Sequence, residues 1–212
     1  MIDETIGATR TWSAGELRQA IWLGYGGISP RRPATVRVAA EIGVSARSVQ
    51  RWLAGRSQPS AGHAAALRAA LAPPSDVLAR QAQDHKHAIA AARELARTRY
   101  RPASKQWRTQ GWHQPHDLRL LHHERLGIAR TVVSRATAAK PLAIPAGWTS
   151  LEVVRYPNRP TAIMAKHELL ERVAPWRVRV RPDLAVAGRH EIWLNNAPFG
   201  KLVAGPQTPE GL

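Results

Sequence analysis

The segment Val38–Leu53 constrains the fold of this chain more than any other, because small, flexible and apolar residues follow one another in it at fixed spacing. Ala39 is small enough for a second helix to approach the first, and Gly43 supplies the positive φ that a tight turn needs. Val44 is placed to fill the corner between the helices, and Ser45 to cap the second helix. The spacing predicts a helix-turn-helix.

The residues after this turn extend the motif. Val49 and Trp52 lie three positions apart, so both can anchor the second helix to a core. After Trp52 come Gly55, the basic Arg56 and then Pro59-Ser60. This order resembles the Cro and phage-repressor family of helix-turn-helix proteins. The resemblance covers only the N-terminal part of the chain.

Flanking helices complete this predicted domain. One is expected from about Ser13 to Leu23 and another from about Ala61 to Leu71, both with apolar residues at helical spacing. The insert Gly24–Pro33 is longer and richer in glycine than we expect between the first two helices. We therefore predict a repressor-type helix-turn-helix domain with an unusual connection before its central motif.

The resemblance implies that the second helix of the motif enters the major groove of DNA. There Arg47 could pair with guanine and Gln50 with adenine. Other polar residues are better placed for phosphates, which position a protein without reading sequence. The predicted DNA-binding residues of the motif are Arg37, Ser45, Arg47, Ser48, Gln50, Arg51 and Arg56.

The charge of the chain supports a polyanionic partner. There are 31 Lys and Arg against 15 Asp and Glu, a formal net charge of +16 at pH 7. Such an excess creates a field that attracts nucleic acid or an anionic membrane. No stretch approaches the ~20 apolar residues of a membrane span. The N-terminus lacks the basic and apolar regions of a secretory signal, so we expect a cytoplasmic protein without a membrane partner.

Three sections follow one another along the chain. Residues 1–74 form the helix-turn-helix domain, which ends at the helix-breaking pair Pro73-Pro74. Residues 75–108 form a long helix, capped at Ser75-Asp76 and ending near Arg97, and then a basic arm. The helix has few apolar positions, so we expect it to be exposed or bridging. Residues 109–212 form a second domain, and the predicted fold is mainly α with a C-terminal α+β part.

The second domain is predicted to begin with a helical hairpin, roughly Pro115–Arg125 and Ala129–Ala139. Gly127, Ile128 and Val133 repeat the spacing of Gly43, Val44 and Val49 in the first motif. A large His123 stands where the first motif has a small residue, so an ordinary hairpin with a basic outer face is favoured. If the segment does read DNA, its contacts are Arg130, Thr131, Ser134 and Arg135.

The basic arm, Arg97–Arg108, has two interpretations to which we give equal weight. Arg99 and Arg101 would contact DNA if the arm follows a backbone or enters a minor groove. The alternative is a solvated linker. Tyr100 and Trp107 could stack on bases, although tryptophan is more often a core residue.

The tail from Pro141 is predicted to be a small α+β unit. Strands are expected at Leu151–Tyr156, Trp176–Arg181 and His190–Leu194, with a helix at Thr161–Val173 and a return strand at Lys201–Val203. The strict alternation in the second strand would place three arginines on one face, and we favour a solvent face over a phosphate-binding one. The expected core residues are Trp176, Val178, Val180, Ile192, Trp193 and Leu194.

Catalytic and metal sites find little support. The chain has no cysteine, no Walker loop and no Gly-x-Ser-x-Gly motif, and its acids are scattered. His85 and His87 straddle Lys86 in a predicted helix, which does not suit a two-histidine nickase. The spacing of His113, His116, His122 and His123 matches no standard metal motif. We therefore predict no catalytic residues, no metal and no cofactor.

The predicted function is a sequence-specific regulator that binds double-stranded DNA, a repressor of a phage, plasmid or bacterium. The first alternative is a replication, telomere or partition protein with the same motif, and others are a nucleic-acid enzyme and an antitoxin-like interaction module. A homodimer on a palindrome and a single chain on an asymmetric site both stay open.

Overall fold

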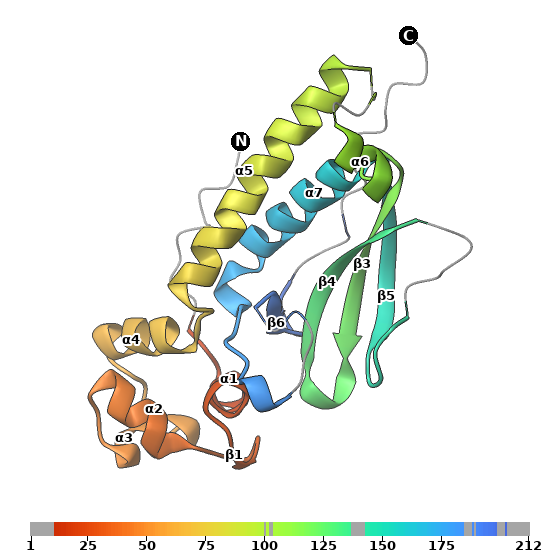
Figure 1. The fold of residues 1–212 in the computed structure, drawn as a ribbon. Helices are drawn as coiled ribbons and strands as arrows, with labels where there is room; N and C mark the ends of the chain where they lie inside the picture. Colours follow the sequence, from red (N-terminus) through yellow and green to blue (C-terminus); the bar gives the residue numbers. More distant parts are fainter. Residues whose placement is uncertain are drawn as a thin grey trace, which may run out of the picture. The chain divides into compact units, whose positions relative to one another are not determined.

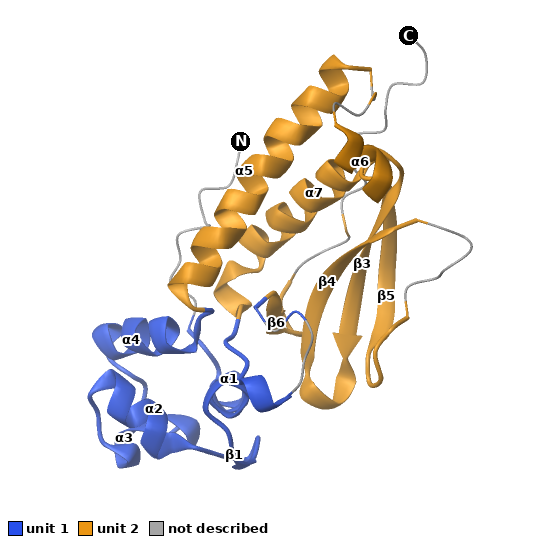
Figure 2. Cartoon of the chain, in the orientation of Figure 1, with its two compact units in different colours: residues 1–73, 178–190 blue, residues 74–177, 191–212 orange. Residues whose placement is uncertain are grey.

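A computed structural model of the chain describes residues 11–99, 101, 104–136, 143–184, 188, 190–198 and 202 (Figure 1). The chain divides into two compact units (Figure 2). Unit 1 comprises residues 1–73 and 178–190, and unit 2 comprises residues 74–177 and 191–212. The linear division into 1–74, 75–108 and 109–212 did not foresee that residues 178–190 pack with the N-terminal part.

Unit 1 is built from four short helices and a small β-hairpin. The helices are α1 (Ala14–Tyr25), α2 (Thr35–Ile42), α3 (Ala46–Leu53) and α4 (Ala61–Leu71). Side-chain caps start three of them: Ser13 and Glu16 form a capping box at α1, Ser45 accepts from the N–H of Ser48 at α3, and Ser60 accepts from the N–H of His63 at α4. The flanking helices are therefore confirmed. The core of this unit includes Leu17, Ile21, Leu23, Val38, Val49, Trp52, Leu67 and Leu71.

The glycine-rich insert between α1 and α2 forms a β-hairpin, which the sequence did not predict. Its strands are β1 (Gly27–Ser29) and β2 (Arg32–Pro33). Gly27 has φ 130°, and a Cβ there would lie 2.5 Å from the carbonyl oxygen of Arg32. Only glycine lets the two strands cross this closely.

Residues 178–184, here called the strap, do not form the predicted strand. Val178 and Val180 are buried as expected, but the backbone N–H of Arg179 donates to the Leu71 oxygen at 2.6 Å. The guanidinium of Arg181 lies 5.4 Å from the Trp22 ring centre, and its Nη1 donates to the Trp22 oxygen. The strap pairs with helix ends instead of a neighbouring strand, so the arginines stabilise unit 1 and do not line a sheet face.

Unit 2 is an α+β unit with a four-stranded antiparallel sheet. The strands are β3 (His116–His123), β4 (Ile128–Arg135), β5 (Thr149–Tyr156) and β6 (Ile192–Leu194), in the order β5-β3-β4-β6. Helix α7 (Arg159–Arg172) packs on β3, β4 and β5, and α5 (Ser75–Arg97) packs on α7 (Figure 1). The short helix α6 (Lys105–Gln110) precedes the sheet. These observations confirm the expected strands near 151–156 and 190–194 and the helix between them.

The predicted helical hairpin is wrong, because its two halves are the antiparallel strands β3 and β4. They pair from His116 with Arg135 to His123 with Ile128, around a turn in which Gly127 has φ 59°. Leu118 and Leu120 alternate toward the core beneath α7. Short apolar runs fit a helix or a strand equally well. Pairing of β3 with β5 decides the matter, and that contact is remote in sequence.

Helix α5 has the predicted bounds, but one of its faces is buried, which the sequence did not predict. It begins after Pro74, and no side chain caps it, so Ser75 is its first residue and not its cap. Val77, Ala88 and Leu95 are buried, and the helix packs along α7. The sequence predicted an exposed or bridging helix. It missed this buried face because one of the three buried residues is a small alanine.

The core of unit 2 gathers between the sheet and α7. Ile192, Trp193 and Leu194 are all fully buried, which means that β6 is covered on both faces. Leu202 is buried outside any strand, and Lys201 and Val203 of the predicted return strand lie outside the described residues. No helix among the described residues is long and apolar enough to cross a membrane. The core members include Leu118, Leu120, Ala129, Tyr156, Ala162, Leu169, Leu170 and Trp193.

Candidate nucleic-acid interface

Helices α2 and α3 meet at a sharp corner. Gly43 ends α2 in the left-handed conformation with φ 72° and ψ 33°. The N–H of Val44 donates to the Ala39 oxygen at 3.0 Å, and Ala39 is buried. The small residue, the turn glycine and the half-buried corner residue therefore occupy the positions that the sequence predicted for them.

Replacing Gly43 with alanine tests this corner. A Cβ at Gly43 would meet no atom within 4 Å, so the expected cost comes from the left-handed backbone alone. We expect the free energy of unfolding to fall by about 1–2 kcal/mol, as measured by urea denaturation. An unchanged midpoint would show that the turn does not hold this conformation. Gly62→Ala, within helix α4, should not destabilise the protein.

The N-terminal end of α3 is capped by its own serines. The Ser45 Oγ accepts from the N–H of Ser48 at 3.1 Å, and the two hydroxyls lie 2.9 Å apart. This bond satisfies an otherwise unpaired donor of the first turn. Both hydroxyls are thus already engaged with each other, so any phosphate contact from Ser45 or Ser48 would share them with the cap.

One face of α3 holds the helix in unit 1. Val49 is fully buried, Trp52 is 8% exposed, and the Trp52 ring centre lies 5.7 Å from that of His63. At the other end, Arg18 of α1 donates from Nη1 to the Leu53 oxygen at 3.0 Å. Sequence reasoning missed Arg18, although a cation beside a helix C-terminus is a favourable pairing. The helix is therefore fixed at both ends and along one side.

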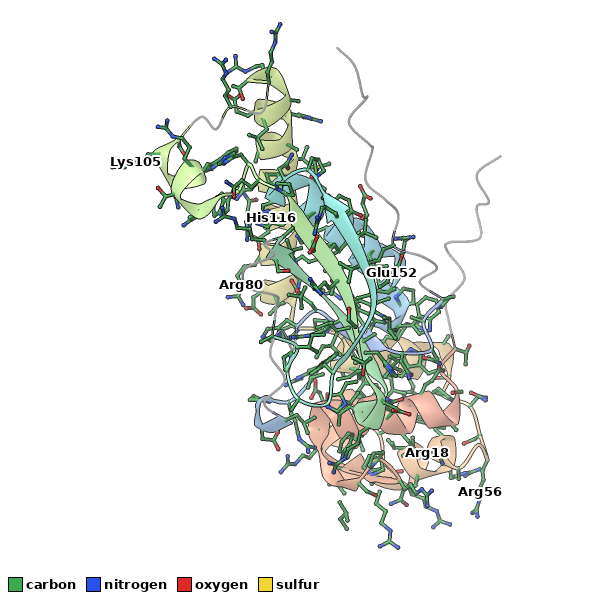
Figure 3. All side chains as sticks on the ribbon, turned by 90° about the vertical axis from the view of Figure 1, so that its right-hand side faces the viewer. Arg18, Arg56, Arg80, Lys105, His116 and Glu152 are labelled. Carbon is green, nitrogen blue, oxygen red and sulfur yellow. The ribbon has the colours of Figure 1, made fainter. Side chains whose placement is uncertain are left out.

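The opposite face of α3 is exposed and basic. Arg47, Gln50 and Arg51 are exposed, and with Ala54 and Arg56 they line an open hollow of about 540 Å³. No acid lines this hollow, and Figure 3 shows Arg56 projecting away from the ribbon. The structure thus brings together four of the predicted site residues: Arg47, Gln50, Arg51 and Arg56.

Arg37 lies apart from this hollow. It is exposed on α2, and its Nη1 donates to the Tyr25 oxygen at 3.4 Å, at the base of the β-hairpin. Arg37 also lines a second open hollow of about 560 Å³ with Gly26, Gly27 and Arg181. The predicted phosphate contact of Arg37 would therefore lie beside the hairpin and not beside α3.

The predicted contacts on β4 need correction. Arg130 is 6% exposed and Thr131 is 2% exposed, so neither side chain can reach a duplex in this fold. The Arg130 guanidinium lies 4.7 Å from the Trp148 ring centre, and burial lowers its pKa. Both residues lie in strand β4, and the helix that was predicted to expose them does not form. Ser134, half-buried on the same strand, loses its proposed role with them.

The remaining predicted cations of unit 2 are exposed. Arg99, which has φ 50°, and Arg101 follow α5, while Tyr100 lies outside the described residues. Arg135 donates to the Gln114 side chain. Trp107 packs against Trp112 at 6.2 Å between ring centres, which is a structural contact. Lys105 lies at the start of α6 and projects outward from the ribbon (Figure 3).

The histidines of unit 2 make separate contacts. His116 Nδ1 lies 2.9 Å from the Gln114 oxygen, and His122 Nε2 lies 3.1 Å from Asn195. His123 packs edge-on against Trp148. In the part of the chain that the structure describes, no group of three or more His, Cys, Asp or Glu residues is arranged to hold a metal ion.

The chain matches no protein-family model, no curated protein and no solved structure. Its function must therefore be inferred from the corner between α2 and α3, the exposed face of α3 and the charge. These three features lie in unit 1 or belong to the whole sequence.

Proposed function

We propose that this protein is a sequence-specific regulator that binds duplex DNA through a helix-turn-helix formed by α2 and α3. The observation that carries the proposal is the division of α3 into two faces. Val49 and Trp52 bury one face, whereas the opposite face presents Arg47, Gln50 and Arg51 to solvent. A helix anchored in this way can enter a groove without losing its packing.

The thickness of a helix such as α3 suits this role. An α-helix with its side chains is about 10–12 Å across, and the major groove is about 12 Å wide. Arg47 and Gln50 lie three positions apart, so both point toward the same few bases. Arginine pairs with the O6 and N7 of guanine, and glutamine pairs with the N6 and N7 of adenine. These two residues are the proposed base readers.

Phosphate contacts supply the rest of the proposed interface. Arg51 and Arg56 flank the reading face, and Ser45 and Ser48 stand at the N-terminal end of α3. The net charge of +16 adds a long-range attraction that salt screens. In unit 2, the exposed residues Arg99, Arg101 and Arg135 are proposed for further phosphate contacts. We propose that the protein acts as a cytoplasmic repressor.

Selection of bound sequences from a random duplex pool tests the proposal. We expect a defined preferred site, and affinity for it should fall steeply as salt rises. The mass of the complex then separates the two symmetry options. A dimer requires two half-sites about one helical turn apart, and a single chain requires an asymmetric site. A pool that stays random after repeated selection would contradict sequence-specific binding.

Substitutions on α3 test the base readers. We expect Arg47→Ala or Gln50→Ala to weaken binding to the preferred site by about 1–3 kcal/mol and to relax base choice at the position that each residue reads. Binding isotherms on the preferred site and its point variants measure both effects. Arg80→Ala on α5 is the control, because Arg80 is exposed and its ion pair is with Asp76 on its own helix. If both variants keep the parent preference, α3 is not the reading helix.

A further inference from the structure

The β1–β2 hairpin is joined directly to the start of α2. Gly27 pairs with Pro33 and Ser29 with Arg32, with a shift in register between the two pairs. The N–H of Ala34 donates to the Gly26 oxygen at 2.8 Å, which closes the base of the hairpin directly before α2. Because there is no room for a Cβ at Gly27, the two strands are in direct backbone contact at this point. The hairpin therefore lies next to the N-terminal end of α2.

The surface of this hairpin combines an apolar residue with cations. Ile28 is 84% exposed, the largest value among the large hydrophobic side chains that the structure describes. Arg31 and Arg32 at the turn are exposed, and Val36 at the start of α2 is 69% exposed. Ile28 and Val36 together expose apolar surface whose removal from water by a partner would be favourable.

The charge around the hairpin identifies the kind of partner. No Asp or Glu occurs between Glu16 and Glu41, so the hairpin itself carries no acid. Asp183 of the strap lines the hollow beside the hairpin, but it is paired with Arg181 at 2.8 Å, so cations still outnumber acids there. A second copy of this surface would bring like charges together, which costs free energy. A polyanion with apolar sugar and base edges complements both parts of the surface. Duplex DNA has that chemistry.

The position of the hairpin favours the duplex that α3 reads. In helix-turn-helix complexes the first helix crosses the DNA backbone while the second lies in the major groove. Here α2 is that first helix, and the hairpin is joined to its N-terminal end through Pro33 and Ala34. A hairpin at this end lies over the backbone beyond the bases in contact with α3.

We propose that the β1–β2 hairpin is a second DNA contact, in which Arg31 and Arg32 bind phosphates next to the α3 site and Ile28 packs against the sugars of the adjoining groove. This inference rests on the proposed function, because it requires α3 to dock first. The hairpin adds affinity and a longer footprint. It adds little base preference, since its contacts are to the backbone.

The salt dependence of binding measures the two arginines. Each phosphate contact contributes about 0.9 to the slope of log K against log salt concentration. We expect Arg31→Gln with Arg32→Gln to lower that slope by about 1.8 on the preferred site, with the same ranking of site variants. The matched control is Arg80→Gln with Arg93→Gln, which removes the same charge from α5.

Ile28 is tested by exchange for serine. The side chain is exposed in the free protein, so Ile28→Ser should not change the thermal midpoint. We expect affinity to fall roughly 3- to 10-fold, as partial burial of a large aliphatic group predicts, and hydroxyl-radical protection to shrink at one flank of the site. Full protection and full affinity would overturn the proposed contact.

The outcomes separate the two proposals. If the hairpin variants keep the parent slope and footprint while Arg47→Ala relaxes base choice, the hairpin proposal alone is wrong. If the parent shows no base preference and Arg47→Ala changes nothing, the proposed function fails and the hairpin proposal fails with it. If Ile28→Ser changes the sedimentation coefficient of the free protein but not its DNA affinity, a second copy covers the hairpin instead.

Discussion

Trp52→Ala is expected to lower the free energy of unfolding by about 3–5 kcal/mol, because it removes the largest side chain that anchors α3. Trp52 is 8% exposed, packs against the His63 ring and lies beside the fully buried Val49. Loss of this side chain leaves a cavity beneath α3, so the reading face is no longer held in place. Urea denaturation monitored by circular dichroism measures the cost, and the variant should lose specific binding.

Arg51→Ala is the matched control at the neighbouring position. Arg51 is exposed, so its replacement should leave the free energy of unfolding within about 0.5 kcal/mol of the parent value. Its DNA affinity should nevertheless fall. The pair separates residues that shape α3 from residues that touch DNA. Equal stability of the Trp52 and Arg51 variants would mean that α3 is not anchored as the structure describes.

Acidification from pH 7 to pH 4 is expected to lower the free energy of unfolding, and His167 alone should account for about 3 kcal/mol of the loss. His167 is 4% exposed on α7, and its ring stacks on that of His85 with 5.0 Å between centres. Its Nε2 is buried and has no hydrogen-bond partner among the residues that the structure describes. Burial is the main cause that lowers the pKa of His167 to about 4, and the positive charges of Lys166, His85 and Arg177 contribute to the same shift.

The sign of this effect follows from the direction of the pKa shift. Above pH 6.5 His167 is neutral in both the folded and the unfolded chain, so it contributes no pH dependence there. Between pH 6.5 and pH 4 the unfolded chain takes up a proton that the folded chain rejects. Stability therefore falls as pH falls through this window and levels off below it.

His167→Gln isolates this contribution. We expect the plot of unfolding free energy against pH to flatten between pH 6.5 and pH 4 relative to the parent, whatever the stability of the variant at pH 7. Burial also lowers the pKa of His116, so part of the slope should persist. His87→Gln, at an exposed position of α5, is the control for replacing a histidine with glutamine. A slope unchanged by His167→Gln would contradict the burial of a neutral imidazole.

The helices predicted best are those with local signals at their ends. Helix α4 has the bounds predicted for it, because Ser60 caps its start and the Pro73-Pro74 pair lies just beyond its end. Helix α5 begins directly after that pair. Gly43 and Ser45 likewise mark the turn and the start of α3. A cap or a left-handed glycine acts over a few residues, so a linear pattern is sufficient to find it.

Part of the candidate site was also predictable. Once the bounds of α3 are known, the helical period places Val49 and Trp52 inward and Arg47, Gln50 and Arg51 outward, as the structure has them. The support from Arg18 and the hairpin at residues 27–33 were not predicted. Both depend on segments that approach α2 and α3 from elsewhere in the fold.

The corner between α2 and α3, the caps of the short helices and the charge of the chain follow from local sequence, because each depends on residues close together or on composition alone. Long-range packing was needed to show that residues 116–123 and 128–135 are strands, that the strap belongs to unit 1, and that Arg130 and Thr131 are buried. The two groups differ in the sequence separation of the contacts on which they depend. Strand β3 pairs with β5, and the strap bonds to the ends of α1 and α4. The local sequence of these segments is compatible with more than one conformation. Their partners, which are distant in the chain, decide which one forms.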